Sequence, residues 1–221
     1  MPSLLLGTRN AGKVREIETI LGDIPWQLRS LNEFPHIGAA AETAPTYADN
    51  AIAKAQFYAR ETGLYALADD SGLEVEALNG APGVFSARYA GEGATDADRR
   101  ALLLSELARV SELARVADVN ARDLVTGMHG VDVNRRARFI CVVAVAMPDG
   151  TVLNTSDGVC EGTIIFEERG TNGFGYDPLF VPDGFDQTFA ELNDSIKNRI
   201  SHRARALWKT REFLTSNLSA A

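Results

Sequence analysis

Two segments of this chain combine glycines with side chains that can do chemistry. The first is Asp69-Asp70-Ser71-Gly72, and the second is Gly173-Phe174-Gly175-Tyr176-Asp177-Pro178. Core packing requires neither adjacent aspartates after an apolar run nor a turn of this composition. Departures from ordinary periodicity cluster at functional sites, so both segments are candidates for one.

The aspartate pair suits metal binding and proton transfer. Asp69 and Asp70 follow an apolar run, 64–68, which predicts a buried strand ending at the pair, and ligands usually bind at strand ends in α/β folds. Paired carboxylates can hold a hard cation such as Mg²⁺, and one can accept a proton from water. Neighbours on an extended chain point to opposite faces, so the two need not do the same job. The alternative is a polar turn with one capping aspartate.

A second candidate lies between the first expected strand and the first expected helix. Gly7 to Lys13 fits the phosphate-binding pattern G-x-x-x-x-G-K, but Val14 stands where a P-loop has Ser or Thr. A strand-to-helix turn still presents backbone N–H groups and a positive helix end to an anion, and Lys13 adds a charge. The alternative is an ordinary turn with a solvated lysine.

Polar residues at the start of the next helix favour a structural interpretation. Asp49, Asn50 and Lys54 fall on its first turns, with Glu42 in the loop before it. Asn50 and Lys54 are one turn apart on one face. Helix capping with a solvated face is the preferred reading of this group.

The glycine-rich segment near residue 175 suits a flat ligand. Gly173 and Gly175 flank Phe174 and allow close approach of the backbone, while Phe174 and Tyr176 could stack on a base. A hairpin with core aromatic residues is the alternative. Further along, Lys197 and Arg203 have charges suited to phosphate, although read alone they are surface charges.

Hydrophobic periodicity predicts the elements that carry these residues. We expect strands at 3–7, 26–31, 64–68, 73–77, 137–147, 151–155 and 159–166, short extended pieces at 180–181 and 188–190, and helices at 11–21, 46–61, after Thr95, and at 200–218. Alternating strands and helices followed by hairpins indicate an α/β fold with a mixed central β-sheet flanked by helices.

One stretch departs from this pattern. The six residues SELARV occur twice in succession, from Ser105 to Val116, and a six-residue period does not match a coiled-coil heptad. We expect a local duplication that lengthens an exposed helix. Residues 118–136 are polar and predicted to be irregular, and about 111–135 is predicted to be a surface insertion.

Composition narrows the classes of protein. The net charge of −8 argues against a general nucleic-acid scaffold, and no apolar run approaches a membrane span. The first residues lack the features of a signal peptide, so a cytoplasmic location is expected. Cys141 and Cys160 lie in apolar surroundings and are expected to be buried thiols. The three histidines form no metal-ligand pattern with them.

Five motifs in order identify a family. They are Thr8-x-Asn10-x-x-Lys13, Asp69-Asp70-Ser71-Gly72-Leu73, Gly80-x-Pro82-Gly83-x-x-Ser86-Ala87-Arg88, Gly173-Phe174-Gly175-Tyr176-Asp177-Pro178 and Ile200-Ser201-His202-Arg203. Together they closely resemble the inosine/xanthosine triphosphatase family, which are pyrophosphatases acting on non-canonical purine nucleoside triphosphates. The resemblance covers roughly residues 4–214.

The resemblance implies one domain over residues 1–221 with two lobes around a deep substrate cleft, and a homodimer. It implies Mg²⁺-dependent cleavage of ITP, dITP and XTP to the monophosphate and pyrophosphate, which keeps deaminated purines out of DNA and RNA. It implies no nucleic-acid or membrane partner.

The resemblance also assigns roles to residues of this chain. Asp70 would be the general base and a metal ligand, with Glu42 and Asp69 as further candidate ligands. N–H groups of Arg203 or of the backbone would donate to the oxygen at C6 of the base. The implied substrate-binding residues are Thr8, Arg9, Asn10, Ala11, Gly12, Lys13, Ser71, Phe174, Gly175, Tyr176, Asp177, Lys197, His202 and Arg203.

The chain departs from the family pattern at three places. Asp49 precedes Asn50 where Glu is common, Ala41 stands before Glu42 where a second acidic residue is frequent, and the stretch 111–135 is longer than usual. Three other functions stay open: a P-loop phosphotransferase, a pyrophosphatase for modified pyrimidine nucleotides, and a non-catalytic nucleotide-binding module.

Overall fold

The computed structural model describes residues 1–122 and 134–217. Residue contacts divide the chain into two compact units. Unit 1 comprises Met1–Ser71, Phe139–Cys160 and Asn193–Ala221, and unit 2 comprises Gly72–Arg138 and Glu161–Leu192. The chain passes between the units within three long strands, β3 (Tyr65–Val75), β4 (Arg136–Ala146) and β5 (Val152–Ile164).

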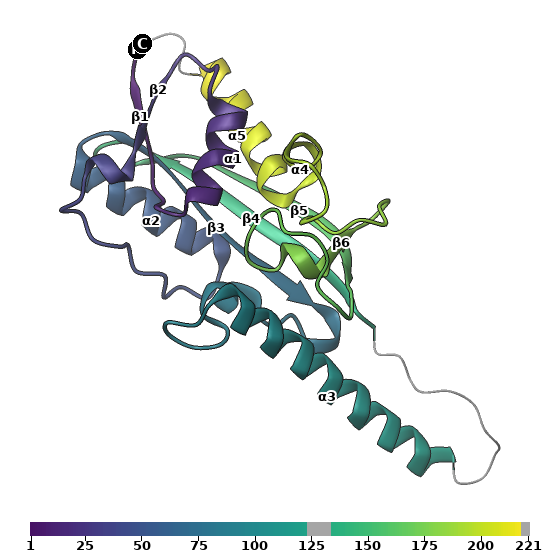
Figure 1. Ribbon diagram of the computed structural model, residues 1–221. Coiled ribbons are helices and arrows are strands. Elements are labelled where there is room, and N and C mark those ends of the chain that lie inside the picture. The colour runs from purple at the N-terminus through teal and green to yellow at the C-terminus, as the bar shows by residue number, and fades with distance from the viewer. Residues whose placement is uncertain (123–133, 218–221) are drawn as a thin grey trace. The chain divides into compact units, whose positions relative to one another are not determined.

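A six-stranded sheet in the order β2-β1-β3-β4-β5-β6 forms the framework (Figure 1). The shorter strands are β1 (Ser3–Leu6), β2 (Gln27–Ser30) and β6 (Phe180–Pro182). β1 pairs in parallel with β2 and β3, whereas β5 and β6 are antiparallel. The predicted mixed α/β fold is therefore confirmed.

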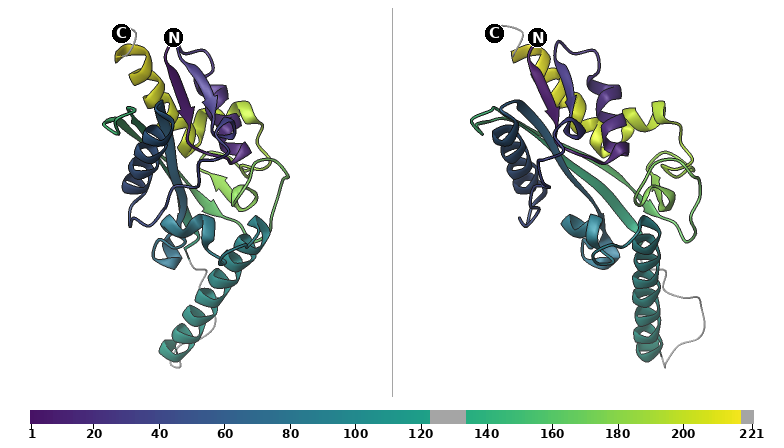
Figure 2. Two further views of the ribbon diagram at one scale, coloured as in Figure 1. Left: turned by 90° about the vertical axis from the view of Figure 1, so that its left-hand side faces the viewer. Right: turned by 60° about the vertical axis from the view of Figure 1, so that its left-hand side comes forward.

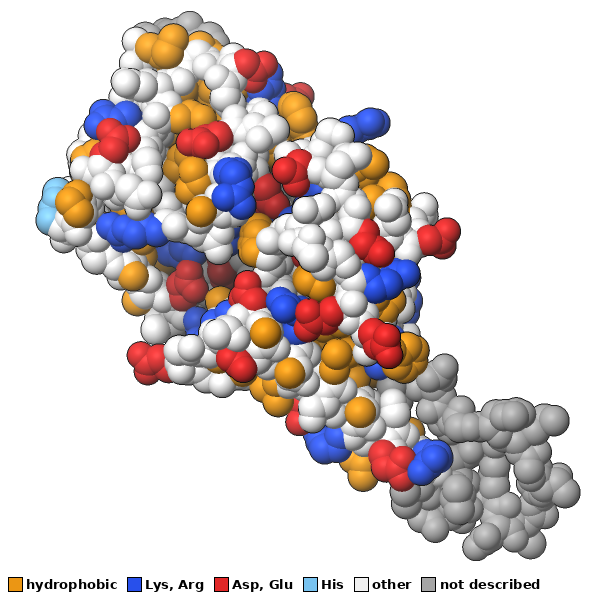
Figure 3. Space-filling view, viewed as in Figure 1, with side chains coloured by type: hydrophobic (Ala, Val, Ile, Leu, Met, Phe, Trp, Pro, Cys, Tyr) orange, Lys and Arg blue, Asp and Glu red, His pale blue; other side chains and the backbone are white. Residues whose placement is uncertain are grey.

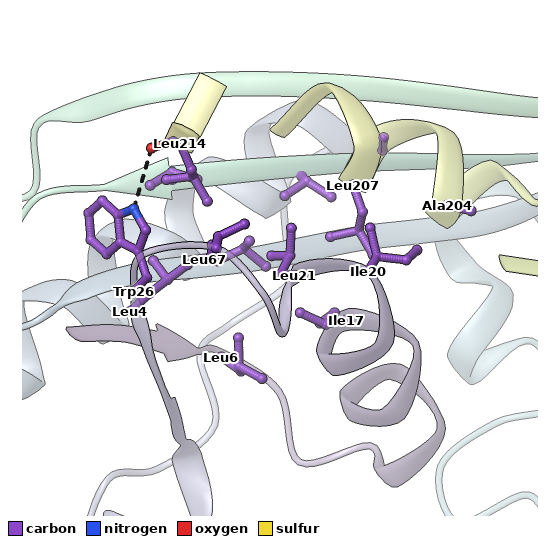
Figure 4. Close-up of a cluster of buried hydrophobic side chains, with 14 of the residues drawn as sticks. Leu4, Leu6, Ile17, Ile20, Leu21, Trp26, Leu67, Ala204, Leu207 and Leu214 are labelled. Atoms are coloured by element: carbon purple, nitrogen blue, oxygen red, sulfur yellow. Dashed lines mark hydrogen bonds between the residues drawn. The ribbon is translucent and has the colours of Figure 1, made fainter. Parts of the chain in front are cut away.

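Helices of unit 1 cover both faces of its strands. α1 (Ala11–Leu21) and α5 (His202–Asn217) pack on the side of β1 that presents Leu4 and Leu6 (Figure 4). On this side the Trp26 indole N–H donates to the Leu214 carbonyl at 3.4 Å. α2 (Tyr47–Thr62) packs on the opposite side, against Leu5. This alternation of leucines along β1 follows from the two-residue period of a strand.

Unit 2 contains the longest helix, α3 (Asp96–Arg122), which is continuous in every view (Figure 2). Its start has a reciprocal cap, in which the Asp98 amide donates to the Thr95 hydroxyl and the Thr95 amide donates to the Asp98 carboxylate. Both SELARV copies lie in α3, and each carries its own Glu–Arg ion pair, at 2.7 and 2.9 Å. The lengthened helix that the duplication predicted is therefore present.

Several predicted boundaries are wrong. β3 is one strand through residues 65–75, so Asp69 and Asp70 lie within it and not at its end; β5 is likewise one strand. The final helix, predicted at 200–218, is α5 at 202–217, and the short helix before it, α4 (Asp194–Ile200), was not predicted. Of the stretch 118–136, predicted to be irregular, residues through 122 are helical, 136 begins β4, and 123–133 lie outside the described residues. Hydrogen bonding across the sheet extends strands past polar residues that single-sequence patterns take as ends.

The cysteines agree with the expectation from the sequence. Acidic and basic side chains are interspersed on the face shown in Figure 3. Cys141 and Cys160 are both buried free thiols. No helix in the described part of the chain has the length and apolarity to cross a membrane.

Candidate active site

The aspartate pair presents its carboxylates to opposite faces of β3. Asp69 contacts Lys13 of α1 and Arg203 of α5, whereas Asp70 contacts Asn50 of α2. This is the alternation expected of neighbours on an extended strand. The prediction that the two aspartates need not do the same job is consistent with these different surroundings.

Asp69 is the centre of a buried ion-pair cluster. Its Oδ2 lies 2.9 Å from Lys13 Nζ and 3.1 Å from Arg203 Nε, and its side chain is 1 % exposed. Burial raises the pKa of Asp69, but the charges of Lys13 and Arg203 outweigh it and hold the pKa well below its ordinary value. Asp69 is therefore an anion at neutral pH, and it fixes two cations.

Asp70 has the opposite electrostatic character. Its Oδ2 accepts a hydrogen bond from Asn50 Nδ2 at 3.0 Å, and its Oδ1 accepts one from the Ser71 amide at 3.0 Å. Burial raises the pKa of Asp70, and the carboxylate of Glu42 raises it further, while Lys54 and the Asn50 hydrogen bond oppose the shift. Two hydrogen bonds thus fix the carboxylate of Asp70, and its affinity for a proton is increased.

Lys54 connects the Asp70 side of the strand to the preceding loop. Its ammonium group donates to Glu42 Oε1 at 2.5 Å and to the Asp69 carbonyl at 2.7 Å. Lys54 and Asn50 are both buried, at 7 % and 1 % exposure, so the interpretation of this face of α2 as solvated is wrong. The capping part of that interpretation is confirmed, since the Asp49 amide donates to the Thr46 hydroxyl.

The turn before α1 is organised by Asn10. Asn10 Oδ1 accepts from the amides of Gly12 and Lys13, and Thr8 Oγ1 accepts from the Asn10 amide. Two amides predicted to face an anion are therefore occupied by the cap. The Arg9 guanidinium donates to carbonyls of the loop at 34–37, so it braces that loop in this structure.

Gly7 lets this turn lie close to the sheet. A Cβ there would come within 2.9 Å of the Leu67 carbonyl oxygen and 2.8 Å of the Tyr58 ring. The Gly7 amide donates to that same carbonyl at 2.7 Å. The backbone contact that places Thr8 to Lys13 beside β3 is thus available only to glycine.

Glu16 forms ion pairs with a basic residue from each of the last two helices. Its carboxylate lies 2.9 Å from Lys197 Nζ and 2.6 Å from an Arg203 terminal nitrogen. Arg203 also donates to the Ser71 hydroxyl at 2.9 Å, so all three of its guanidinium nitrogens contact protein oxygens. In this structure Arg203 holds α5 to β3 and α1.

His202 is the buried neutral residue of this group. Its ring stacks on Phe139 with centroids 4.6 Å apart, and its Nδ1 has no hydrogen-bond partner among the described residues. Burial lowers its pKa well below 6.5, with the charges of Arg203 and Lys197 in the same direction. The imidazole is therefore uncharged at neutral pH.

The glycine-rich loop at 173–177 belongs to unit 2 and is braced internally. Asp177 Oδ2 accepts from the Phe174 amide at 2.9 Å, and the Tyr176 hydroxyl donates to the Ser86 carbonyl at 3.0 Å. Tyr176 and Asp177 are buried, at 4 % and 3 % exposure, whereas Phe174 is half-buried. Of the two aromatic residues predicted to stack on a base, Tyr176 is engaged in the interior of unit 2.

Comparison with known proteins adds to this geometry. The model of the Ham1 family matches residues 4–213. The chain belongs to the Ham1 family. It is 47 % identical over 211 residues to the dITP/XTP pyrophosphatase of Desulforamulus reducens (96 % of this chain, 94 % of that protein), and 46 % identical over 207 residues to that of Desulfotalea psychrophila (94 % and 82 %).

Solved structures of Ham1 proteins share the fold. The HAM1 protein from Coxiella burnetii superposes with a TM-score of 0.77 at 41 % identity, covering 97 % of this chain and 99 % of that one. The nucleoside-triphosphatase / dITP/XTP pyrophosphatase from Mycobacterium abscessus gives 0.68 at 38 % identity, covering 94 % and 98 %. Membership of the Ham1 family argues against the P-loop phosphotransferase alternative, which Val14 already disfavoured.

The donor set of this Ham1 chain fits a magnesium ion on the Asp70 side of β3. The described residues contain no group of three or more His, Cys, Asp or Glu side chains that could hold a metal. Mg²⁺ needs fewer, since it commonly binds one or two carboxylates together with substrate phosphates and water. Asp70 and Glu42 repel each other, and a cation would relieve this repulsion. Asp69 is less suitable, because it faces the other way and is paired with Lys13 and Arg203.

Sequence reasoning missed part of this Ham1 site. Glu16 follows Lys13 at the i,i+3 spacing of one helix face, and Asn50 and Lys54 share a face at i,i+4. These spacings were the available signals. The spacings were insufficient, because they do not show that these faces of α1 and α2 are buried against β3.

Proposed function

We propose that this chain hydrolyses dITP, XTP and ITP to the nucleoside monophosphate and pyrophosphate and thereby clears deaminated purines from the nucleotide pool. The observation that carries the proposal is Asp70, a buried carboxylate of raised pKa that Asn50 and the Ser71 amide hold in place. Its setting is a Ham1-family chain whose relatives are named dITP/XTP pyrophosphatases.

Asp70 acts as the general base. One of its oxygens takes a proton from water as the water attacks the α-phosphorus and pyrophosphate leaves. The hydrogen bonds from Asn50 and from the Ser71 amide fix the orientation of the carboxylate. This positioning matters for catalysis, because a general base must lie within hydrogen-bond reach of the proton that it takes.

Positive side chains of unit 1 offset the charge of the triphosphate. Lys13 is held beside the start of α1 by Asp69, and Thr8 to Gly12 provide the turn that carries it. Bound Mg²⁺, held by Asp70 and Glu42, would neutralise phosphate charge that repels the attacking water. Lys54 keeps Glu42 in place for this role.

Of the remaining predicted residues, Ser71 contacts the substrate and the others shape the pocket for its sugar and base. The remaining residues are Ser71, Phe174, Gly175, Tyr176, Asp177, Lys197, His202 and Arg203. His202 offers a neutral, unsatisfied Nδ1, which supports a role in contacting substrate. As the family resemblance implies, the enzyme works as a homodimer in the cytoplasm.

A substrate panel tests the proposal. Pyrophosphate release is measured with ITP, XTP, dITP, ATP, GTP and dUTP at equal concentration, with Mg²⁺ and with excess chelator. We expect fast Mg²⁺-dependent release from ITP, XTP and dITP and little from the others. Preference for dUTP would favour the pyrimidine-nucleotide alternative, and release of γ-phosphate would overturn the proposal.

The Asp70→Asn variant tests the role of the base. Turnover should fall by about 10²- to 10⁴-fold, the usual contribution of a general base, while nucleotide affinity measured by calorimetry without Mg²⁺ changes little. Asn keeps the size of the side chain and one acceptor for Asn50. A non-catalytic binding module would show no turnover in the wild type, and unchanged turnover in the variant would exclude Asp70 as the base.

A further inference from the structure

Unit 2 contains a contact that the reaction as described does not use. Two side chains of α3, Asp96 and Arg100, hold the two backbone polar groups of one loop residue, Gly175. The Gly175 amide donates to Asp96 Oδ2 at 2.8 Å, and Arg100 donates from a terminal nitrogen to the Gly175 carbonyl at 2.9 Å. We call Asp96 and Arg100 the Gly175 clamp.

The clamp also contacts a residue that precedes the 173–177 loop. Arg100 Nε lies 2.9 Å from Glu168 Oε1, so one guanidinium group connects Glu168 to Gly175. Arg100 is only 14 % exposed, so water competes weakly for its contact with Gly175, whereas Glu168 is 42 % exposed. Asp96 is fixed in turn by Arg99, whose guanidinium lies 2.7 Å from its Oδ1.

Helical spacing makes the clamp rigid. Asp96 and Arg100 are one turn apart and so project from the same face of α3. Gly175 has a φ of +62°, a conformation that side-chain-bearing residues rarely adopt, and its backbone groups are held from both sides. The 173–177 loop is also braced by the side chains of Asp177 and Tyr176. The position of the loop backbone is therefore set by the first turns of α3.

We propose that Asp96 and Arg100 are positioning residues that fix the 173–177 loop for recognition of the purine base. This inference rests on the proposed function, which assigns that loop to the base. The loop presents Phe174 as its half-buried aromatic residue, directly before the clamped Gly175. Small displacements of a positioning group cost much binding and selectivity, so losing the clamp weakens base recognition and leaves phosphate binding intact.

The test compares variants of the clamp with a control on the same helix. Asp96→Ala removes the acceptor for the Gly175 amide, Arg100→Leu removes the donor, and Asp96→Asn is the conservative variant that keeps an acceptor oxygen. Arg109→Leu is the control, because it deletes an exposed Arg–Glu pair of α3 far along the helix from Asp96. Each protein is checked by thermal unfolding.

Three readouts separate positioning from general damage. They are KM and kcat for XTP, the ratio of kcat/KM for XTP over GTP, and the inhibition constant of pyrophosphate, a product that carries no base. We expect Asp96→Ala and Arg100→Leu each to raise KM for XTP about tenfold, the effect of one lost hydrogen bond to a well-held group, and to lower the XTP over GTP ratio. The pyrophosphate constant should stay at its wild-type value, and Asp96→Asn should lie close to wild type.

The double variant Asp96→Ala/Arg100→Leu gives a further check. Both side chains act on one residue, so the fold increase in KM of the double variant should be well below the product of the fold increases of the two single variants. A wild type inactive on every nucleotide would overturn the proposed function. An active wild type whose clamp variants keep the XTP over GTP ratio, or lose pyrophosphate inhibition equally, or behave as Arg109→Leu does, would overturn the clamp alone.

Discussion

The adjacent aspartates Asp69 and Asp70 have pKa values that are shifted in opposite directions. The pKa of Asp69 lies far below its ordinary value and that of Asp70 lies above it. Burial raises both, so the difference comes from neighbours: Lys13 and Arg203 face Asp69, whereas Glu42 opposes Lys54 and Asn50 around Asp70. Alternation along β3 thus separates a structural anion from a candidate base.

Replacing Asp69 by Asn should destabilise the protein strongly at neutral pH. The change leaves the buried Arg203, and the partly exposed Lys13 beside it, with one fewer anion. Breaking a buried ion pair typically costs about 3–5 kcal/mol. Chemical denaturation of Asp69→Asn against wild type measures it. Thr19→Val is a matched control, because its exposed hydroxyl bonds only the backbone of its own helix. A cost below that of the control would contradict the role of Asp69.

The same pair of proteins makes a prediction about pH. Because the pKa of Asp69 is lowered in the fold, its ion pairs stabilise the fold fully above the ordinary value of 3.8, and this stabilisation is lost as pH falls toward the lowered pKa. The difference in unfolding free energy between wild type and Asp69→Asn should therefore be constant from neutral pH to about pH 5 and should narrow below 3.8. A difference that is independent of pH down to pH 3 would contradict it.

At the scale of elements, close backbone contacts decide where the functional side chains lie. Gly158 of β5 supports the first turn of α5, which carries His202 and Arg203. A Cβ at this position would lie 2.1 Å from the His202 carbonyl oxygen and 2.6 Å from the Ala206 amide nitrogen. Both are backbone atoms, so the helix itself must shift to accept a methyl group.

Gly158→Ala should move α5 away from the sheet and weaken the contacts of Arg203 with Asp69. Overpacking of this kind costs about 1–3 kcal/mol, and we expect a fall in melting temperature accompanied by a loss of activity. Gly38→Ala is the control, because nothing lies within 4 Å of a Cβ there. Equal behaviour of the two variants would show that α5 does not depend on this approach.

At the scale of the whole molecule, the lengthened part of α3 is separate in sequence from the site residues. Residues 111–116 are the second SELARV copy, and the clamp residues lie in the first turns of the helix, before either copy. Arg135, included in the predicted insertion at 111–135, donates to the Ile164 and Ile165 carbonyls and so belongs to the frame of unit 2. A deletion that tests the insertion must therefore keep it.

Replacing residues 111–133 by a short Gly/Ser linker should leave activity intact. The steady-state rate with XTP and the melting temperature are the measurements. Extending the deletion through Arg135 should lower the melting temperature, because the buried carbonyl of Ile164 and the partly buried carbonyl of Ile165 lose their donor. Loss of turnover in a folded 111–133 deletion would show that the insertion takes part in function.

The sequence alone determined what depends on local pattern and motif: the mixed α/β class, the extent of α1, the cap of α2, the buried cysteines and the family. Tertiary structure decided what depends on which faces meet. It made β3 continuous through the aspartates, buried Asn50 and Lys54, and joined Glu16 to Lys197 and Arg203. Burial and charge pairing depend on residues far apart in the chain. A periodic pattern in one segment does not show which other segment packs against it.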